Sequence, residues 1–271
     1  MTVRIAVAGA GGRMGQALVE GILAQPELEL AAALDAPDTP FLGRDAGERM
    51  GRRTGVVVVS DVRAALQACD VLIDFTRPEG TLAHARACAE CGVGMVVGTT
   101  GLGAGQRAQL ASHAQSIPVV FAPNMSVGVN VLARLVEMAA SRLGPAYDIE
   151  IVEMHHRHKV DAPSGTALLL GEAAARATGT TLEDAGVYAR EGTTGARVAG
   201  TIGFAALRGG DVVGEHTVIF AADGERLELT HRASSRQTFA GGALRAARFV
   251  AARRAARENG LFDMTDVLDL V

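Results

Sequence analysis

The chain has 271 residues, a formal net charge of −4 at pH 7 and a hydrophobic content of 48%. This length and composition exclude a disordered chain and allow two modest hydrophobic cores. Aromatic residues make up 4% of the sequence and tryptophan is absent, so we expect no nucleic-acid partner. The sequence contains no apolar run as long as a membrane span and no signal-peptide pattern. We therefore predict a cytoplasmic protein that binds neither nucleic acid nor membranes.

The three cysteines are an odd number, which suits a reducing compartment. Cys88 and Cys91 have the C-x-x-C spacing, but they lie in a helical pattern with no second pair of ligands nearby. A metal or redox role is the alternative to ordinary helix packing. We favour packing and predict no metal site.

The first predicted strand, residues 3–8, leads into a glycine-rich segment and an amphipathic helix. Glycines at positions 9, 12 and 15 would let the backbone approach a pyrophosphate at the start of that helix. The next strand, residues 28–34, ends at Asp35, where a ribose-binding carboxylate is expected. The pattern predicts a dinucleotide site, and a tight turn without a ligand is the alternative.

The residues after Asp35 bear on the choice of cofactor. Enzymes that use the 2′-phosphorylated cofactor usually place an arginine near this acid, whereas here Ala36 and Pro37 follow it. This favours NADH over NADPH. Arg13, in the glycine-rich turn, could still reach a phosphate, so use of both cofactors stays open.

Strands and helices continue to alternate over the first half of the chain, which predicts a doubly wound parallel sheet. Further strands are expected at 56–59, 71–75, 95–97 and 119–121, with helices at about 61–68, 79–91 and 105–116. In such sheets the ligand lies beyond the carboxyl ends of the strands. We therefore expect segments 74–78, 98–101 and 122–126 to form the rim of a cofactor cleft.

The second half changes character after a helix at about 129–143. A strand at 148–154 is followed by three strands with short polar links, at 200–207, 216–221 and 226–232, which indicate a mainly antiparallel open sheet. One face of that sheet needs cover, so we expect subunits to associate through it.

The predicted fold class is α/β: an N-terminal Rossmann-like domain (1–126, completed by the C-terminal helix within 238–271) and a C-terminal α+β domain for substrate and oligomerisation (127–237).

The segment 153–167 carries the most distinctive chemistry. Lys159 is the single lysine among 26 basic residues, and three of the seven histidines, at positions 155, 156 and 158, lie beside it. An ammonium or an imidazole can exchange a proton near neutral pH, which a guanidinium cannot. Ser164 and Thr166 suit the start of a helix at 167–176, so cations would face a helix N-terminus, as a small dicarboxylate requires. A three-histidine metal site and a solvated turn are the alternatives.

These residues resemble the 4-hydroxy-tetrahydrodipicolinate reductase family, also called dihydrodipicolinate reductase, of the diaminopimelate and lysine pathway. The likeness runs from residue 3 to residue 271. The motif that carries it is Glu153-x-His-His-Arg-His-Lys-x-Asp-Ala-Pro-Ser-Gly-Thr-Ala167. Supporting motifs are Gly9-Ala-Gly-Gly-Arg-Met-Gly15, Asp74-Phe-Thr-Arg-Pro78, Gly98-Thr-Thr100 and Gly200-Thr-Ile-Gly-Phe204.

The resemblance implies a role for each matching position. His155 matches the family's proton donor and acceptor, and Lys159 matches its proton donor. The substrate-binding positions are matched by His156, Gly165 and Thr166. The cofactor-binding positions are matched by Gly9, Ala10, Gly11, Gly12, Arg13, Met14, Asp35, Gly98, Thr99, Thr100, Ala122, Pro123, Asn124 and Met125. The family is usually a cytoplasmic homotetramer, and Asp35-Ala36 departs from the Glu-Arg of some members.

The expected reaction is NADH- or NADPH-dependent reduction of the unsaturated ring of 4-hydroxy-tetrahydrodipicolinate, with protonation by His155 and Lys159. We expect the ammonium of Lys159 to be crowded by like charge from His155 and Arg157. A dehydrogenase acting on another amino or keto acid would share the nucleotide half but would not need the histidine cluster. A nucleotide-sensing protein would bind the cofactor without turnover.

Overall fold

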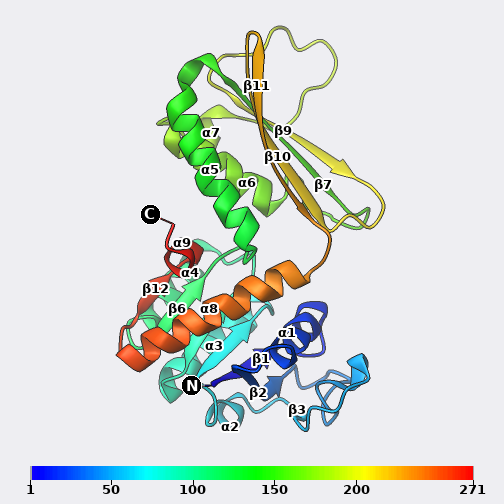
Figure 1. Cartoon of the computed structure of the whole chain (residues 1–271), viewed down its shortest axis with the longest axis vertical. Helices are drawn as coiled ribbons and strands as arrows, with labels where there is room; N and C mark the ends of the chain where they lie inside the picture. Colours follow the sequence, from blue (N-terminus) through cyan, green and yellow to red (C-terminus); the bar gives the residue numbers. More distant parts are fainter. Residues whose placement is uncertain (1, 271) are drawn as a thin grey trace. The chain divides into compact units, whose positions relative to one another are not determined.

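The computed structural model describes residues 2–270, which form two compact units. One unit combines residues 2–127 with residues 236–269, and the other is the continuous segment 128–235. The first unit is therefore built from two stretches of chain that are distant in the sequence (Figure 1). No helix within residues 2–270 is both long enough and apolar enough to cross a membrane.

The first unit contains a seven-stranded parallel sheet in the order β12-β6-β5-β4-β1-β2-β3. Its strands are β1 (Val3–Ala8), β2 (Leu28–Leu34), β3 (Val58–Val59), β4 (Val71–Asp74), β5 (Gly94–Val97), β6 (Pro118–Phe121) and β12 (Gly260–Phe262). The connecting and covering helices are α1 (Arg13–Leu23), α2 (Val62–Leu66), α3 (Pro78–Cys91), α4 (Ala104–His113), α8 (Gln237–Ala256) and α9 (Met264–Leu268). The predicted doubly wound sheet is confirmed, and β12 is an additional strand.

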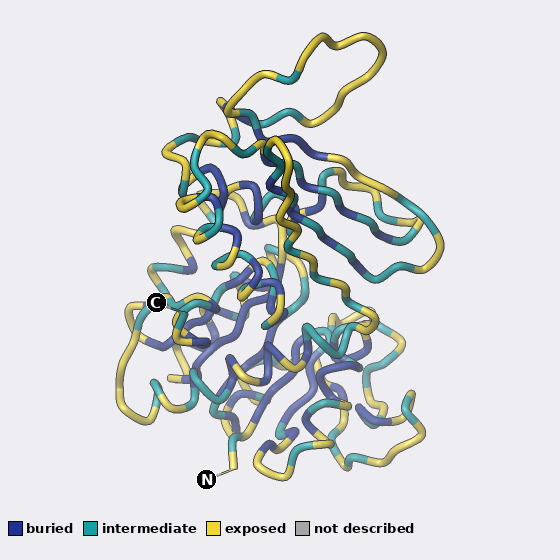
Figure 2. Tube along the Cα trace, turned by 45° about the horizontal axis from the view of Figure 1, so that its top comes forward, coloured by how far each residue is buried: buried dark blue, intermediate teal, exposed yellow. Residues whose placement is uncertain are grey.

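The central strands are mainly apolar because helices cover both faces of a parallel sheet, and Asp74 at the end of β4 is a buried exception. Every residue of β4 and β5 is buried, and the centre of this unit appears as a continuous buried region in Figure 2. Cys88 lies on α3 within this core and Cys69 lies beside it, and burial raises the pKa of both thiols. Their environment is that of packing residues.

Helix α8 packs against β4, β5 and β6 and against α1. The face it turns to the sheet is made of small residues, including Gly242, Ala243 and Ala247. A Cβ added at Gly242 would lie 1.7 Å from the carbonyl oxygen of Met125. The backbone of α8 therefore touches the chain directly at the end of β6.

The second unit holds a five-stranded sheet in the order β11-β10-β7-β9-β8. Its elements are α5 (Val127–Leu143), β7 (Asp148–His155), α6 (Gly165–Ala177), α7 (Leu182–Ala185), β8 (Gly186–Val187), β9 (Ile202–Arg208), β10 (Gly214–Ala222) and β11 (Glu225–Ala233). Two short 3₁₀ turns, Glu48–Met50 in the first unit and Gly144–Ala146 here, complete the description. The open sheet beside helices agrees with the predicted α+β class.

One pairing differs from the sequence prediction. The short link after β9 does not make an antiparallel hairpin with β10, because β7 lies between them and pairs parallel with β9. The β10–β11 link is an antiparallel hairpin as predicted. The long connection between β7 and β9, which contains α6, provides the crossover that a parallel pair needs.

Helices α5, α6 and α7 cover one face of this sheet (Figure 1), where alternate residues such as Ile151 and Val218 are buried. Register places the opposite set on the other face, including Val152, Met154 and Ile219, which are only partly buried. On that face Leu207 is 45% exposed. Within residues 2–270 no helix covers this second face, on which the apolar residues lie beside polar ones such as Glu150 and Thr217.

Two adjacent glycines of α8 should respond oppositely to the same substitution. Gly242→Ala places a methyl group on the backbone of Met125, and such overpacking costs about 1–3 kcal/mol. Gly241→Ala meets no atom within 4 Å and should stabilise the helix by about 0.5–1 kcal/mol. Thermal unfolding followed by circular dichroism checks both. Equal melting temperatures for the two variants would contradict the packing described for α8.

Candidate active site

The glycine-rich turn lies between β1 and α1 at the carboxyl edge of the parallel sheet. Gly9 has a φ of +69°, which favours glycine. A Cβ at Gly15 would lie 2.1 Å from the Gly9 carbonyl oxygen, so the helix can approach the turn only because this residue is glycine. Gly12 is the N-cap of α1 and has no side chain to satisfy the first-turn N–H groups. These groups are suited to bind an anion.

Asp35, at the end of β2, faces this turn. Its Oδ2 accepts a hydrogen bond from the N–H of Gly11 at 2.9 Å, and its Oδ1 accepts one from the N–H of Ala36 at 2.9 Å. The carboxylate lines a cavity of about 750 Å³ together with Gly9 and Gly12. That volume is within the range of small-molecule sites. The turn, the acid and the cavity fit a dinucleotide.

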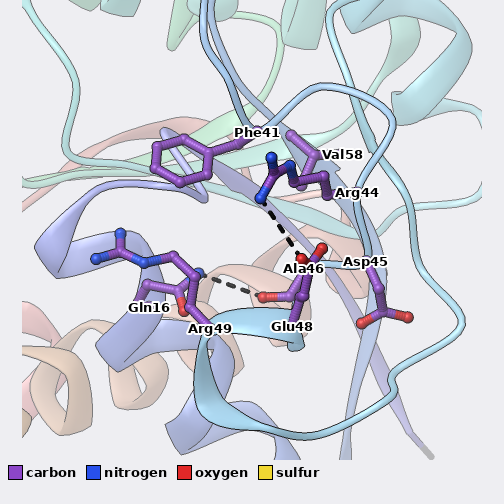
Figure 3. A pocket seen from close by; sticks show the side chains of 8 residues that line it. All are labelled: Gln16, Phe41, Arg44, Asp45, Ala46, Glu48, Arg49 and Val58. Atoms are coloured by element: carbon purple, nitrogen blue, oxygen red, sulfur yellow. Dashed lines mark hydrogen bonds and ion pairs between the residues drawn. The ribbon is translucent and has the colours of Figure 1, made fainter.

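The loop 36–57 contacts the glycine-rich turn through Phe41 and Arg49. Figure 3 shows these two side chains beside Gln16 of α1 around a small pocket. Arg49 Nη1 donates a hydrogen bond to the carbonyl oxygen of Gly11 at 2.6 Å, and its guanidinium lies 5.2 Å from the centre of the Phe41 ring. A Cβ at Gly11 would overlap that ring at 2.0 Å. Sequence reasoning missed both Phe41 and Arg49, because nothing in a loop pattern identifies which side chains fold back on the turn.

A buried carboxylate connects two of the strand-end segments, 74–78 and 98–101, with helix α3. Asp74, fully buried at the end of β4, accepts hydrogen bonds from the N–H and Oγ1 of Thr76, both at 2.7 Å, and from Thr99 Oγ1 at 3.2 Å. His84 Nδ1 lies 2.7 Å from Asp74 Oδ2. Burial raises the pKa of Asp74, but the hydrogen bonds from His84 and Thr76 outweigh burial and lower it.

His84 was not singled out from the sequence, since it lies within helix α3 and outside the quoted motifs. The structure places it and Thr76 on the wall of the same cavity as Asp35. The remaining lining residues are Leu34, Ala36, Pro37, Asp38, Ser60, Val62, Phe75, Arg77, Glu79 and Gly80. Three carboxylates and one arginine therefore surround the cavity.

The other predicted cofactor residues lie at the same edge of the sheet. Arg13 and Met14 begin α1, and the N–H of Ala10 donates to the carbonyl oxygen of Leu34 at 2.9 Å. Gly98 and Thr100 follow β5, and a Cβ at Gly98 would overlap the Phe75 ring. Segment 122–125 follows β6, with Ala122 and Met125 buried, Pro123 exposed and Asn124 Oδ1 accepting from the N–H of Ser126 at 2.8 Å.

Glu153 is the centre of the polar cluster in the second unit. It is 1% exposed, and its Oε2 lies 2.6 Å from His155 Nδ1 and 2.8 Å from Arg208 Nη1. Its Oε1 accepts from Arg208 Nη2 at 2.8 Å and from the N–H of Ser164 at 3.1 Å. Burial raises the pKa of this carboxyl, but Arg208 and His155 outweigh it and hold the pKa below its usual value.

The cluster continues through Ser164 to a second buried histidine. Ser164 caps α6 as predicted, since its Oγ accepts from the N–H of Ala167 at 3.1 Å. The same Oγ lies 3.0 Å from His216 Nε2. The His216 and His155 rings meet edge to face with centroids 5.1 Å apart. Burial, and then the positive charge of His155, lowers the pKa of His216 to about 3.

Lys159 has an anionic partner that the sequence prediction overlooked. Its Nζ donates to both oxygens of Asp161 at 2.8 Å. We expected like charge from His155 and Arg157 around this ammonium. The turn also brings the carboxylate of Asp161, two residues along the chain, into contact with it, and that expectation did not include this contact. For the neighbouring His155, burial lowers the pKa of the imidazole. The hydrogen bond and negative charge of Glu153 raise this pKa, but by less than burial lowers it.

The predicted substrate-binding residues flank this cluster. Gly165 and Thr166 are the first two residues of α6, so their backbone lies at the positive end of the helix dipole. His156 follows β7, and its ring lies 6.2 Å from that of His158. The structure thus brings His155, Lys159, Gly165 and Thr166 into one unit around the end of β7.

A parallel sheet with a glycine-rich first turn and a cavity at its carboxyl edge defines a Rossmann-type oxidoreductase fold. The chain belongs to the dihydrodipicolinate reductase family. Models for the N-terminus and the C-terminus of dihydrodipicolinate reductase match residues 3–125 and 128–268.

Individual relatives agree with that assignment. The 4-hydroxy-tetrahydrodipicolinate reductase of Ralstonia nicotianae is 57% identical over 268 residues, covering 99% of this chain and 100% of its own. That of Burkholderia ambifaria is also 57% identical, with the same coverage. A solved structure, dipicolinate-bound dihydrodipicolinate reductase from Paenisporosarcina sp. TG-14, is 27% identical with a TM-score of 0.75, covering 98% of this chain and 99% of its own.

His216 should make the stability of the second unit depend on pH. Its pKa rises from about 3 in the folded state to an ordinary value of 6.5 on unfolding, so below about pH 6.5 the unfolded chain binds an extra proton. Stability then falls as the pH is lowered from 6.5 towards 3, and His216→Asn should weaken this dependence. Tyr147 and Tyr188, the two tyrosines of the chain, both lie in this unit and report its urea unfolding.

For wild type and for His216→Asn, we compare how far the urea concentration at the unfolding midpoint shifts between pH 7.5 and pH 5.0. Titrating groups that do not interact with His216 contribute equally to both proteins, so the difference in shift reports His216 and the groups coupled to it. The same shift in wild type and variant would show that the buried imidazole does not control this dependence.

Proposed function

We propose that this chain reduces 4-hydroxy-tetrahydrodipicolinate to tetrahydrodipicolinate, with loss of water, in diaminopimelate and lysine biosynthesis. The observation that carries the proposal is the cluster of His155, Lys159 and the first turn of α6 around one strand end. Family membership and the printed names of the relatives support it. A small dicarboxylate is further supported by the dipicolinate in the related solved structure.

We assign the first unit to the nicotinamide cofactor and residues 128–235 to substrate binding and self-association. The reduced nicotinamide, when bound, supplies a hydride. Gly9 to Met14 would hold the pyrophosphate, and Asp35 would accept hydrogen bonds from the ribose. Gly98 to Thr100 and Ala122 to Met125 lie at the strand ends where the remaining contacts are expected.

The residues of the second unit would handle the substrate and its proton. His156, Gly165 and Thr166 would bind its carboxylates, helped by the positive end of α6. His155 and Lys159 would deliver the proton that balances the added hydride. Both carboxylate oxygens of Asp161 accept hydrogen bonds from the Lys159 ammonium, and a third N–H group of the ammonium could donate to a substrate.

A homotetramer in the cytoplasm completes the proposal. The support for the tetramer is the face of this sheet that carries no helix within residues 2–270, where Val152, Met154, Leu207 and Ile219 are partly exposed among polar neighbours. A sheet face of this kind is stabilised by association. The cytoplasmic location stays a prediction from the sequence.

The test of function is oxidation of NADH or NADPH by the purified protein in the presence of substrate freshly generated from pyruvate and aspartate semialdehyde. Lys159→Arg keeps the charge but removes the transferable proton, so turnover should fall by about 10²-fold or more. The reverse exchange nearby, Arg157→Lys, is the control and should be active. Cofactor binding without oxidation would favour a nucleotide sensor, and a fully active Lys159→Arg would end the proton-donor role.

The cavity predicts a preference for NADH, because Asp35, Asp38 and Glu79 would repel a 2′-phosphate. Ala36→Arg should raise the ratio of kcat/KM for NADPH to that for NADH by at least about tenfold, the effect of one charge-assisted hydrogen bond. Ala36→Gln provides similar length without charge. A comparable rise in the glutamine variant would show that charge does not set the preference.

A further inference from the structure

The two nitrogens of His155 have different environments. Nδ1 lies 2.6 Å from Oε2 of Glu153, within a buried cluster. Glu153 keeps its charge despite burial, since Arg208 and His155 lower its pKa. An ionised carboxylate can only accept hydrogen bonds, so Nδ1 must carry a proton. Neutral His155 then has its unprotonated nitrogen at Nε2.

Glu153 has little freedom to change this arrangement. Arg208 donates to both of its oxygens, and the N–H of Ser164 donates to Oε1. The carboxylate is thereby tied to β9 and to the start of α6 as well as to its own strand. Because Arg208 compensates the charge, Glu153 can orient the imidazole without taking its proton.

The environment of Nε2 depends on a glycine of β10. A Cβ added at Gly214 would lie 3.0 Å from Nε2 and 3.4 Å from Cδ2 of His155. The φ of Gly214 is not in the left-handed region, so the backbone does not require glycine here. Because this residue is glycine, no side chain of residue 214 lies against Nε2, and the ring contacts His216 edge to face.

We propose that Glu153 is a positioning residue that fixes the proton of His155 on Nδ1, and that Gly214 keeps Nε2 open, so that Nε2 is the atom that exchanges the proton of the reaction. The inference rests on the proposed function for the role of His155, but the state of the ring can be measured without substrate.

The charged and titratable groups that face His155 define the expected pH response. They are Glu153 on its own strand, Lys159 in the turn after β7, Arg208 at the end of β9 and His216 on β10, while Asp161 pairs with Lys159. Lys159 and Arg208 lower the pKa of His155, whereas Glu153 raises it. Removing the charge of Glu153 should therefore move the His155 titration to lower pH.

The first experiment is ¹⁵N NMR of the full chain with labelled histidines, with His155 assigned through the loss of its signals in His155→Gln. We expect neutral His155 to be protonated at Nδ1 in wild type and to become a mixture of tautomers in Glu153→Gln. Wild-type His155 protonated at Nε2 would overturn the proposal, whatever the outcome of the activity assay.

Kinetics provide the second measurement. Glu153→Gln should lower kcat by at least about tenfold with a small change in KM, because misplacing a proton affects the transition state more than binding. The matched control is Glu150→Gln on the same strand. The Glu150 carboxylate is also paired with arginine, here Arg190 and Arg197 in place of the single Arg208, but it contacts no histidine within residues 2–270. An equal loss of kcat in the control would assign the effect to structure and overturn the proposal.

The variant Gly214→Ala tests whether access to Nε2 matters independently of which ring nitrogen of His155 carries the proton. It should keep the Nδ1 tautomer while kcat falls by at least about tenfold. Wild-type kcat in this variant would refute the part played by Gly214. If wild type itself failed to oxidise the cofactor, the proposed function would fail, and the tautomer of His155 alone would then decide the positioning role of Glu153.

Discussion

The candidate site depends on the compensation of one buried negative charge, that of Glu153. A carboxylate removed from water costs several kcal/mol unless hydrogen bonds and opposite charge replace its hydration. Here Arg208, Ser164 and His155 do so from three different segments of the second unit. The same requirement that keeps the charge satisfied therefore also brings the end of β9 and the start of α6 to the end of β7.

The first unit uses the same principle at Asp74. This carboxylate also ends a strand, is fully buried and is satisfied by groups from neighbouring segments, including Thr76, Thr99 and His84. In each unit a histidine adjoins the buried acid through Nδ1, which leaves the other ring nitrogen facing away from it. Polar networks of this kind hold their members in one arrangement only when every member has a partner. The rigidity expected of a site thus has a physical source in both units.

Sequence patterns predicted the features that depend on residues close together in the chain. The strand–glycine–helix sequence at 3–23 and the cap at Ser164 are written in consecutive residues, and the structure contains both. The pairing of β7 with β9, the partner of Glu153 at Arg208 and the contact between Ser164 and His216 join residues about fifty positions apart. No period or spacing encodes such contacts, so sequence reasoning found His155 but missed Arg208 and His216.

Helix α8, which covers the sheet of the first unit, is synthesised late because it lies near the C-terminal end of the chain. Gly94 of β5 has no room for a side chain because Val250 of α8 occupies that space, and Gly242 touches the chain beyond β6. During synthesis, β5 and β6 are complete while α8 is still more than a hundred residues away. At ordinary translation rates of about 5–20 residues per second, several seconds pass between the synthesis of β6 and that of α8. During that time α8 cannot cover this face of the sheet. The continuous unit 128–235 can therefore finish folding first. A ribosome-bound intermediate should contain a folded second unit and a first unit whose sheet is still accessible to chaperones.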